Sequence, residues 1–337
     1  MVSLKDIAEK CNVSIATVSK ALNDHSDIGP ETKDMVKRVA KEMGYVPNAA
    51  AKSMKTNRTH NIGVLFMDEA HSGLRHDFFA TVLDSFKRHV ESKGYDITFI
   101  SNDRSFPGRT TYLEHARYRR FDGVVIACVQ FDDPEVIELV KSNIPVVTID
   151  HIYNDTTTIL SDNVDGMSRL LDYVVENGHR KIAYIHGLDS SVTKTRLVTF
   201  NRKMEEYGIE VPEAYLMETP YRDTHGAYLQ TLKLLQLKEK PTVILYPDDY
   251  ACYGGIRAIN EVGLRVPEDI SVVGFDGIRV ARHIRPRITT YKQNTEELGA
   301  QAAENLIDLI ERPKTTLVKL VTVKGELLEG DTLKKLN

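Results

Sequence analysis

Residues 3–23 read SLKDIAEKCNVSIATVSKALN and contain two short helical patterns. The first covers residues 4–11, with Ser3 as its predicted N-cap and Asp6 at the spacing of a capping box. The second begins after Ser14. Two helices joined by so short a turn predict a helix-turn-helix, a unit that places its second helix in the major groove of DNA.

The second helix is predicted to have one apolar face and one small, polar face, given about 100° of rotation per residue. The apolar face can pack on the first helix and on a third helix that begins at Pro30 and stops at Gly44. On the free face, Lys20 could donate to guanine and two apolar residues could touch thymine methyl groups, while two hydroxyls could hold phosphates. The predicted DNA contacts are therefore Ser14, Ile15, Ala16, Thr17 and Lys20. A small helical bundle with a solvated Lys20 is the alternative.

Two longer segments extend this pattern, DIAEKCNVSIATVSKALN and ETKDMVKRVAKEMGYVPNAAAKSM. Together they resemble the DNA-binding headpiece of the LacI/GalR (lactose-repressor) family of bacterial transcriptional regulators. The resemblance implies a headpiece over residues 1–46 and a hinge segment over 47–60. The family's hinge helix folds on DNA and enters the minor groove as a pair, one from each subunit, where an apolar wedge kinks the duplex.

The hinge helix would cover residues 49–55, with Asn48 as its cap, and is too short to be stable alone in water. Met54 matches the position of the wedge, where the family more usually has leucine. Lys55 would lie beside it at a phosphate or groove edge. An ordinary flexible linker is the alternative for this segment.

Charge is divided unevenly along the chain. Residues 1–60 carry ten Lys and Arg against seven Asp and Glu, a balance of +3, whereas the whole chain is −4, so the remainder is −7. A basic end on an acidic body is typical of a DNA-binding module on a carrier that does not itself bind phosphate.

Composition narrows the class of protein further. A length of 337 residues predicts two to three domains, and 42% apolar residues can form a sizeable core. There is no apolar run long enough to span a membrane and no secretory signal at the N-terminus. The three cysteines have neither metal-ligand nor disulfide spacing, so a reduced, cytoplasmic location is expected. No cofactor or metal is expected, and His71 and His76 are interpreted as solvated.

From residue 62 onward, short apolar strands alternate with amphipathic helices, a rhythm that restarts near residue 163. This pattern predicts an α/β fold with two doubly wound, parallel-sheet lobes. The family resemblance continues here, in IPVVTID, NGHRKIAYIHG, GLRVPEDISVVGFDG and RPRITTYKQNTEELGAQAAENLIDLI, and implies a fold similar to periplasmic binding proteins. We expect the N-terminal lobe to comprise 61–160 and 289–318, and the C-terminal lobe to comprise 161–288 and 319–337.

Ligands of such folds bind at the carboxyl ends of the strands, in the cleft between the lobes. Asp249 follows a strand, and a carboxylate accepts hydrogen bonds from the paired hydroxyls of a sugar or nucleoside; it could instead cap the next helix. We expect Asp248 to be its exposed neighbour and Asp276 to be a structural cap. The family's cleft positions imply further contacts. The predicted effector-binding residues are Phe78, Phe79, Asp150, Arg196, Tyr221, Asp249 and Gln293.

The sequence therefore predicts a transcriptional repressor that binds a palindromic operator in double-stranded DNA. A small polar effector controls it, with a sugar favoured over a nucleoside. No heptad helix follows the last strand, so a homodimer is expected rather than a coiled-coil tetramer. Two alternatives are a solute-binding transport receptor and an enzyme that uses Asp150, His151 and Asp249 for acid–base chemistry. The headpiece and the missing signal peptide disfavour the receptor, and no nucleophile elbow, P-loop or metal motif supports the enzyme.

Overall fold

The computed structural model describes residues 2–46, 58–67, 73–100 and 110–336. The chain divides into two compact units, residues 1–59 and 60–337. The predicted hinge helix, with Asn48, Met54 and Lys55, lies outside the described residues, and so does His71. Within the described part, no helix is long and apolar enough to cross a membrane.

The N-terminal unit contains the three predicted helices, α1 (Leu4–Cys11), α2 (Ile15–Leu22) and α3 (Pro30–Glu42). The capping box is present, because the Ser3 side chain accepts from the Asp6 backbone N–H and the Asp6 side chain accepts from that of Ser3. The three helices bury a shared set of side chains: Ile7, Ala8, Cys11, Val18, Ala21, Val36, Val39 and Ala40. Burial of this set stabilises the unit and fixes which face of α2 is exposed.

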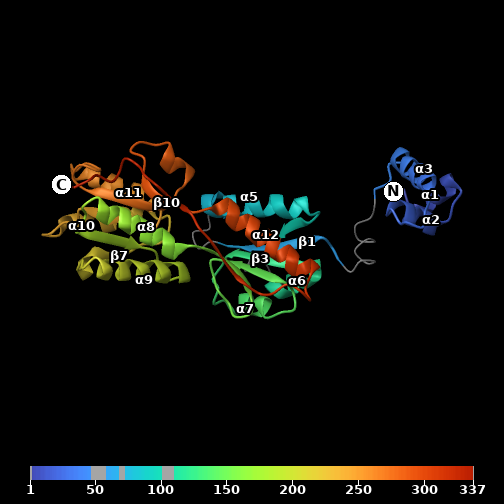
Figure 1. Ribbon diagram of the computed structural model, residues 1–337, viewed down its shortest axis with the longest axis horizontal. Coiled ribbons are helices and arrows are strands. Elements are labelled where there is room, and N and C mark those ends of the chain that lie inside the picture. The colour runs from blue at the N-terminus through green and yellow to red at the C-terminus, as the bar shows by residue number, and fades with distance from the viewer. Residues whose placement is uncertain (1, 47–57, 68–72, 101–109, 337) are drawn as a thin grey trace. The chain divides into compact units, whose positions relative to one another are not determined.

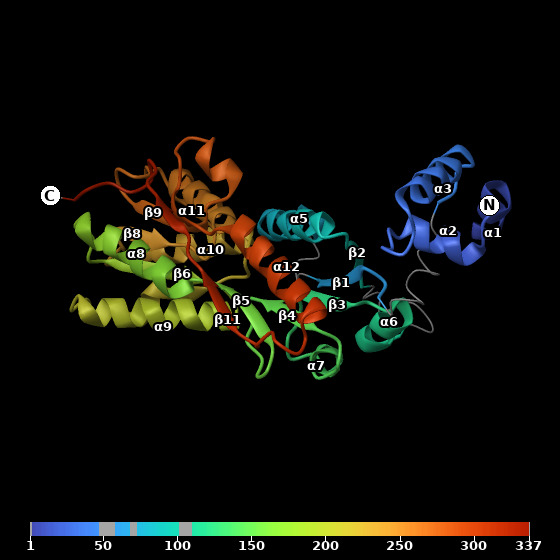
Figure 2. The ribbon, with the colours of Figure 1, turned by 45° about the vertical axis from the view of Figure 1, so that its right-hand side comes forward.

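The second unit has two lobes, each built on a six-stranded sheet (Figures 1 and 2). The first sheet has the order β11-β5-β4-β3-β1-β2. Its strands are β1 (Asn61–Phe66), β2 (Asp96–Phe99), β3 (Gly123–Cys128), β4 (Val146–Ile149), β5 (Thr157–Ser161) and β11 (Leu320–Val323). All of its strand pairs are parallel. Its helices are α5 (Asp77–Ser92), α6 (Tyr112–Arg119), α7 (Pro134–Val140) and α12 (Thr295–Glu311), and a short helix, η1 (Gly73–Arg75), precedes α5.

The second sheet has the order β12-β10-β9-β8-β6-β7, and only the β10–β12 pair is antiparallel. Its strands are β6 (Ile182–His186), β7 (Leu216–Glu218), β8 (Val243–Leu245), β9 (Ser271–Asp276), β10 (Thr289–Lys292) and β12 (Glu326–Leu328). Helices α8 (Asn163–Glu176), α9 (Ser191–Glu206), α10 (Thr224–Gln236) and α11 (Asp249–Glu261) cover it, with short helices η2 (Glu213–Tyr215) and η3 (Arg279–Arg282). The predicted α/β fold with two parallel-sheet lobes is confirmed.

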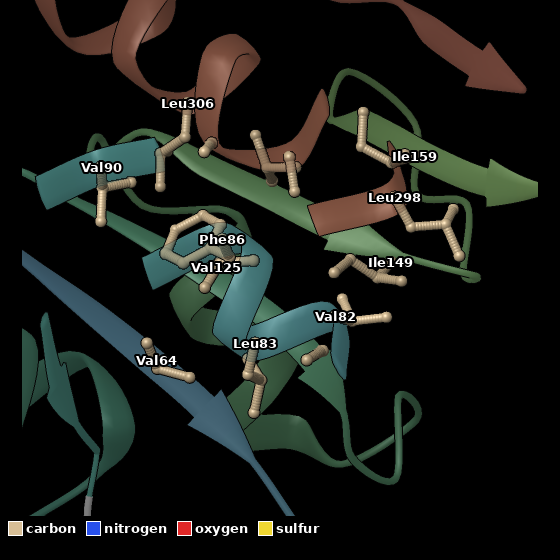
Figure 3. Packing of buried hydrophobic residues seen from close by; sticks show 14 of the residues in the cluster. Val64, Val82, Leu83, Phe86, Val90, Val125, Ile149, Ile159, Leu298 and Leu306 are labelled. Atoms are coloured by element: carbon tan, nitrogen blue, oxygen red, sulfur yellow. The ribbon is translucent and has the colours of Figure 1, made fainter. Parts of the chain in front are cut away.

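The core of the first lobe lies where α5 and α12 cover one face of its sheet (Figure 3). Phe86 from α5 and Leu306 from α12 are fully buried there, together with Val125 from β3. The two helices approach closely at Gly299, where an added Cβ would lie 2.2 Å from the Val82 carbonyl oxygen. The late helix α12 thus returns to the first lobe, as predicted, although more than 200 residues of chain separate it from α5.

Two lobe boundaries were predicted wrongly. Residues 289–292 form β10, which pairs with β9 and β12 and therefore belongs to the second lobe. Residues 320–323 form β11, which pairs with β5 and belongs to the first lobe. The strand before α12, β10, therefore belongs to the second lobe, and the strand after it, β11, belongs to the first lobe. Strand pairing depends on contacts between distant parts of the chain, which a local pattern does not encode.

Candidate functional site

The exposed face of α2 carries the side chains that the sequence analysis assigned to DNA. Ile15 is 49% exposed, and Ala16 and Lys20 are also exposed, whereas Val18 and Ala21 are buried. The partition of α2 into a core face and a free face is therefore confirmed.

Two hydroxyls define the start of α2. The Ser14 Oγ accepts a hydrogen bond of 3.0 Å from the Thr17 backbone N–H and lies 2.8 Å from the Thr17 Oγ1. Ser14 is thus the N-cap of the helix, a role that satisfies one of its free N–H groups. An N-cap hydroxyl at an exposed helix start remains close enough to hydrogen-bond a phosphate as well.

Lys20 is engaged in an ion pair on the same surface. Its ammonium bonds the carboxylate of Asp27, which follows α2, and this hydrogen bond lowers the pKa of Asp27. Both side chains are about half exposed, so water weakens their attraction. Lys20 can therefore exchange Asp27 for a base edge or phosphate at little cost.

A second group of polar side chains gathers where strands of both lobes end. We call it the strand-end cluster. Its members are Asp150, Arg196, Tyr221, Asp248, Asp249, Asp276 and Gln293. Asp150 follows β4 of the first lobe, and the others belong to the second lobe, at or just after strand ends or in the first turns of helices. Asp150 and Asp276 both have left-handed backbone conformations, with φ of 56° and 96°.

Arg196 is the buried cation of this cluster, with 2% of its surface exposed. Its Nε donates to the Asn163 Oδ1 at 2.7 Å, and its Nη1 donates to the Pro247 carbonyl oxygen at 2.9 Å. The guanidinium carbon lies 3.6 Å from the centre of the Phe275 ring, a stacked cation–π contact. These contacts fix the side chain and direct its remaining NH2 group toward Asp276.

Asp276 lies beside Arg196 and Gln293. Its Oδ1 is 4.0 Å from the Arg196 NH2 and accepts a 2.6 Å hydrogen bond from the Gln293 Nε2. Burial raises the pKa of Asp276, although Arg196 opposes the shift. We expected Asp276 to be a structural cap, and its carboxylate contacts the Gln293 and Arg196 side chains.

The adjacent aspartates of α11 also differ from expectation. Asp248 is fully buried rather than exposed, and it is the N-cap of the helix, with its Oδ1 accepting from the Ala251 N–H at 2.9 Å. Its Oδ2 accepts from the Arg222 N–H at 2.7 Å. Burial, followed by the charge of Asp276, raises the pKa of Asp248 to about 6.

Asp249, which the sequence analysis favoured, lies deeper. Its Oδ2 accepts a 2.8 Å hydrogen bond from the Ile278 N–H. Its Oδ1 packs against β9 so closely that an added Cβ at Gly274 would lie 2.2 Å away. Burial raises the pKa of Asp249 well above its ordinary value. This geometry ties Asp249 to the start of η3 and leaves Asp276, whose side chain is 15% exposed, as the most accessible carboxylate of the three.

Asp150 brings a carboxylate from the first lobe. Its Oδ1 accepts from the Ser161 N–H at 2.7 Å, and its carbonyl oxygen accepts from the Ser191 Oγ of the second lobe at 3.1 Å. Burial raises the pKa of Asp150 to about 6, and the charge of Arg196 opposes this rise. Beside Asp150, a pocket of about 290 Å³ is lined from both lobes, by residues that include Ser161, Asn163, Ser191, Thr195 and Thr322.

The three aromatic residues predicted to contact the effector differ in how deeply they are buried. Phe78 is 9% exposed and belongs to the core of the first lobe. Phe79 is only partly buried, and its ring lies 5.3 Å from that of Phe66. Tyr221 donates to or accepts from the Thr193 Oγ1 at 3.0 Å, and its ring is 5.9 Å from the Arg196 guanidinium. Phe79 and Tyr221 thus keep the accessibility that stacking requires, and Phe78 does not.

A further contact between the lobes lies at the start of α5. The Tyr250 hydroxyl, on α11, donates to the Asp77 Oδ2, on α5. The Arg222 guanidinium lies 4.9 Å from the centre of the Tyr250 ring, and its NH2 donates to the Arg75 carbonyl oxygen at 3.4 Å. We call the contact among Asp77, Arg222 and Tyr250 the interlobe clasp. No local sequence pattern predicts this contact, because Asp77 and Tyr250 lie 173 positions apart in the chain.

Comparison with known protein families identifies both units. Residues 3–48 match the family model described as "Bacterial regulatory proteins, lacI family". Residues 171–333 match the model described as "Periplasmic binding protein-like domain". The first match covers the three-helix unit with its exposed α2 face, and the second covers most of the second lobe.

Relatives match over nearly the whole chain. The HTH-type transcriptional repressor PurR of Pectobacterium carotovorum subsp. carotovorum is 32% identical over 92% of this chain and 91% of its own length. PurR of Shigella sonnei is 32% identical with the same coverage. Among solved structures, the lac repressor dimer bound to operator and the anti-inducer ONPF has a TM-score of 0.83 at 24% identity, covering 99% of each chain. The CelR–cellobiose complex has a TM-score of 0.72 at 24% identity, covering 98% of this chain and 100% of that one.

These structural matches establish the fold, and the two sequence relatives, both named as HTH-type transcriptional repressors, establish the class of protein. The chain belongs to the LacI family of bacterial regulatory proteins and is a DNA-binding transcriptional repressor, not an enzyme.

Proposed function

We propose that this repressor binds two-fold symmetric operators as a homodimer and that a small, sugar-type effector bound at the strand-end cluster controls its affinity for DNA. The observation that carries the effector site is the arrangement of Arg196, Asp276 and Gln293. A stacked, buried guanidinium lies beside a carboxylate and an amide at the ends of parallel strands, where such folds bind ligands. The proposal places this repressor in the cytoplasm.

The proposed base contacts are Ile15, Ala16 and Lys20, and the proposed phosphate contacts are Ser14 and Thr17. Their support is the exposed face of α2, since a major groove admits one helix with a free polar face. The resemblance to the family adds a hinge helix over 49–55, with Asn48 as its cap, Met54 as the minor-groove wedge and Lys55 at a phosphate.

The proposed dimer is supported by apolar side chains left exposed on the second lobe. Leu229 on α10, Val262 at the end of α11, and Val280 and Ile284 in and after η3 are each between 40% and 49% exposed. These elements adjoin one another, since the Tyr253 hydroxyl of α11 donates to the Val280 carbonyl oxygen at 3.4 Å. Apolar side chains left exposed on neighbouring elements are typical of a subunit interface.

The preference for a sugar over a nucleoside rests on the residue types in the cluster. Several carboxyls, an amide and an arginine suit a ligand that offers many hydroxyls. Similar solved structures were described with cellobiose and with bound ribose, at 24% and 23% identity, so they are evidence on the fold and not on this ligand.

The proposed function is tested with the full-length protein and sheared genomic DNA. We expect affinity selection to enrich fragments that share a two-fold symmetric site, and light scattering of the free protein to give twice the chain mass. A compound that raises the melting temperature should then change retention of the enriched fragment by about 5- to 150-fold, the usual scale of allosteric coupling. A monomer that enriches no sequence would refute the proposal.

A further inference from the structure

A carboxylate lies on the surface that is proposed to face DNA. Asp27 follows α2, and its Oδ2 accepts a hydrogen bond from the Lys20 ammonium. The Asp27 side chain is 51% exposed and that of Lys20 is 48% exposed, so a partner from outside the protein can reach both. Phosphates repel an aspartate at this place, so Asp27 disfavours DNA binding unless the duplex offers it a donor.

Asp24, three positions earlier, is placed differently. Its Oδ1 accepts a hydrogen bond from the Lys37 ammonium, and its carbonyl oxygen accepts one from the Lys33 ammonium. Both of these lysines belong to α3, the helix that packs against α2. Asp24 therefore bonds the supporting helix, whereas Asp27 bonds a side chain on the free face of α2. The two aspartates carry the same charge in the same loop and form a matched pair for experiments.

On the operator, Lys20 would exchange Asp27 for a guanine. An ion pair between half-exposed side chains changes an equilibrium by about fivefold at most, whereas a good contact to guanine changes it by roughly 5- to 150-fold. The exchange is therefore favourable where a guanine is present. It leaves the Asp27 carboxylate without its donor in front of the duplex, where a donor on a base edge would replace the lost hydrogen bond.

The major groove offers a carboxylate two kinds of donor, the N4 amino group of cytosine and the N6 amino group of adenine. Adenine carries the acceptor N7 beside its amino group, and a carboxylate, which only accepts, is repelled by it. Cytosine has no acceptor at this edge, so it is the better partner. Because the tips of Lys20 and Asp27 touch, Asp27 can reach the base pair that Lys20 contacts or the next one, about 3.4 Å away.

We infer that Asp27 is a second specificity-determining residue, which accepts a hydrogen bond from the N4 amino group of a cytosine at or next to the base pair that Lys20 contacts. The inference rests on the proposed contact of Lys20 with a base. On the operator, one ion pair within the protein is replaced by two contacts with bases. A site that has the guanine but lacks the cytosine leaves Asp27 unpaired and is bound more weakly.

The first test is competition binding of the full-length protein to single-base variants of its enriched operator. We expect the unchanged protein to prefer cytosine at one position of each half-site by at least about fivefold. Asp27→Asn should move this preference toward adenine, because an amide pairs best with adenine N6 and N7. The matched control is Asp24→Asn, which removes the same charge beside α3, fits the left-handed backbone and should keep the cytosine preference.

The second test changes the DNA. An operator with N4-methylcytosine at this position keeps its base pairing and loses the N4 hydrogen that faces the major groove. We expect the unchanged protein to bind it at least about fivefold more weakly, and Asp27→Ala to bind both operators equally. The inference is overturned if Asp27→Asn tightens binding to every variant equally, which would show that the carboxylate only repels phosphates. Lys20→Ala separates the two claims, since an unchanged guanine preference in that variant refutes the proposed base contact itself.

Discussion

In the free protein Lys20 pairs with Asp27, and on DNA it would leave this partner to contact a base. Replacing Lys20 therefore tests base recognition. Lys20→Ala should reduce discrimination at one position of each half-site by about 1–3 kcal/mol, or roughly 5- to 150-fold. The measurement is competition binding against a set of single-base operator variants. Lys41→Ala, which removes the same charge from the last turn of α3, should weaken binding to all variants equally. Equal loss of affinity with Lys20→Ala would contradict the assignment.

Asp150 gives a dependence of stability on pH. Its pKa is about 6 in the folded protein, against an ordinary value of 3.8. The folded protein therefore holds a proton that the unfolded chain has lost, and the free energy of unfolding falls as the pH rises through this window. Arg196 acts against the shift and Asp276 acts with it.

Asp150→Asn removes this penalty and can keep the hydrogen bond from the Ser161 N–H. Relative to the unchanged protein, the variant should gain nothing below about pH 4 and gain at most about 3 kcal/mol above about pH 6. Urea unfolding at several pH values measures the difference. The control is Asp84→Asn, at an exposed aspartate paired with Arg88 on α5. A gain that does not change between these limits would contradict burial of the Asp150 carboxyl as the cause.

The sequence predicted which residues belong to the strand-end cluster better than it predicted how each one is placed there. Arg196, Asp150 and Gln293 lie in it as expected, but Asp276 replaces Asp249 as the accessible carboxylate. A residue that directly follows a strand can be assigned correctly to the edge of the sheet where the strands end. The way Asp249 packs depends on its close approach to Gly274, which only the folded structure reveals.

Among the elements, helices were predicted more reliably than edge strands. All three headpiece helices begin where their caps or first-turn residues predicted. The strands β5 and β7 were missed, because β5 begins with two threonines after a polar loop and β7 has three residues at the edge of its sheet. The lobes of β10 and β11 were predicted wrongly for a different reason, because the lobe of each strand is set by the strand with which it pairs in the folded protein.

At the contact between α5 and α12, replacing a helical glycine by alanine should have the opposite of its usual effect on stability. Alanine in place of a helical glycine ordinarily adds about 0.5–1 kcal/mol of stability. At Gly299 the new Cβ would lie 2.2 Å from the Val82 carbonyl oxygen and 2.8 Å from the Phe86 backbone nitrogen. Gly299→Ala should therefore destabilise the body by about 1–3 kcal/mol in urea unfolding. Glu304→Ala, on the exposed side of the same helix, should change little, and a stabilised Gly299→Ala would refute this packing.

The interlobe clasp should bias the body toward closure. Tyr250→Phe removes the hydroxyl that donates to Asp77 and keeps the ring beneath Arg222. Loss of this exposed hydrogen bond should cost about 1 kcal/mol, or about fivefold in the ratio of open to closed forms. Spin labels on the two lobes can measure this ratio by pulsed electron paramagnetic resonance. Tyr253→Phe is the control, since its hydroxyl bonds Val280 within the second lobe, and an equal change in both variants would contradict the role of the clasp.

At the scale of the whole molecule, one chain joins two functions. A three-helix unit with a free α2 face would bind operator DNA, and an acidic two-lobed body would bind an effector between its strand ends. Effector binding can control DNA binding only if the two sites favour different arrangements of the dimer. This requirement makes the coupling between the sites, and not either affinity alone, the central claim.

The most direct test measures operator affinity by fluorescence anisotropy, with and without a saturating, thermally stabilising probe, in the unchanged protein and in Asp276→Asn. We predict that the probe changes the affinity of the unchanged protein by at least fivefold. In Asp276→Asn the affinity without the probe should be retained and the response to the probe lost. An operator affinity that stays the same when the unchanged protein is saturated with the probe would contradict the coupling of the two sites.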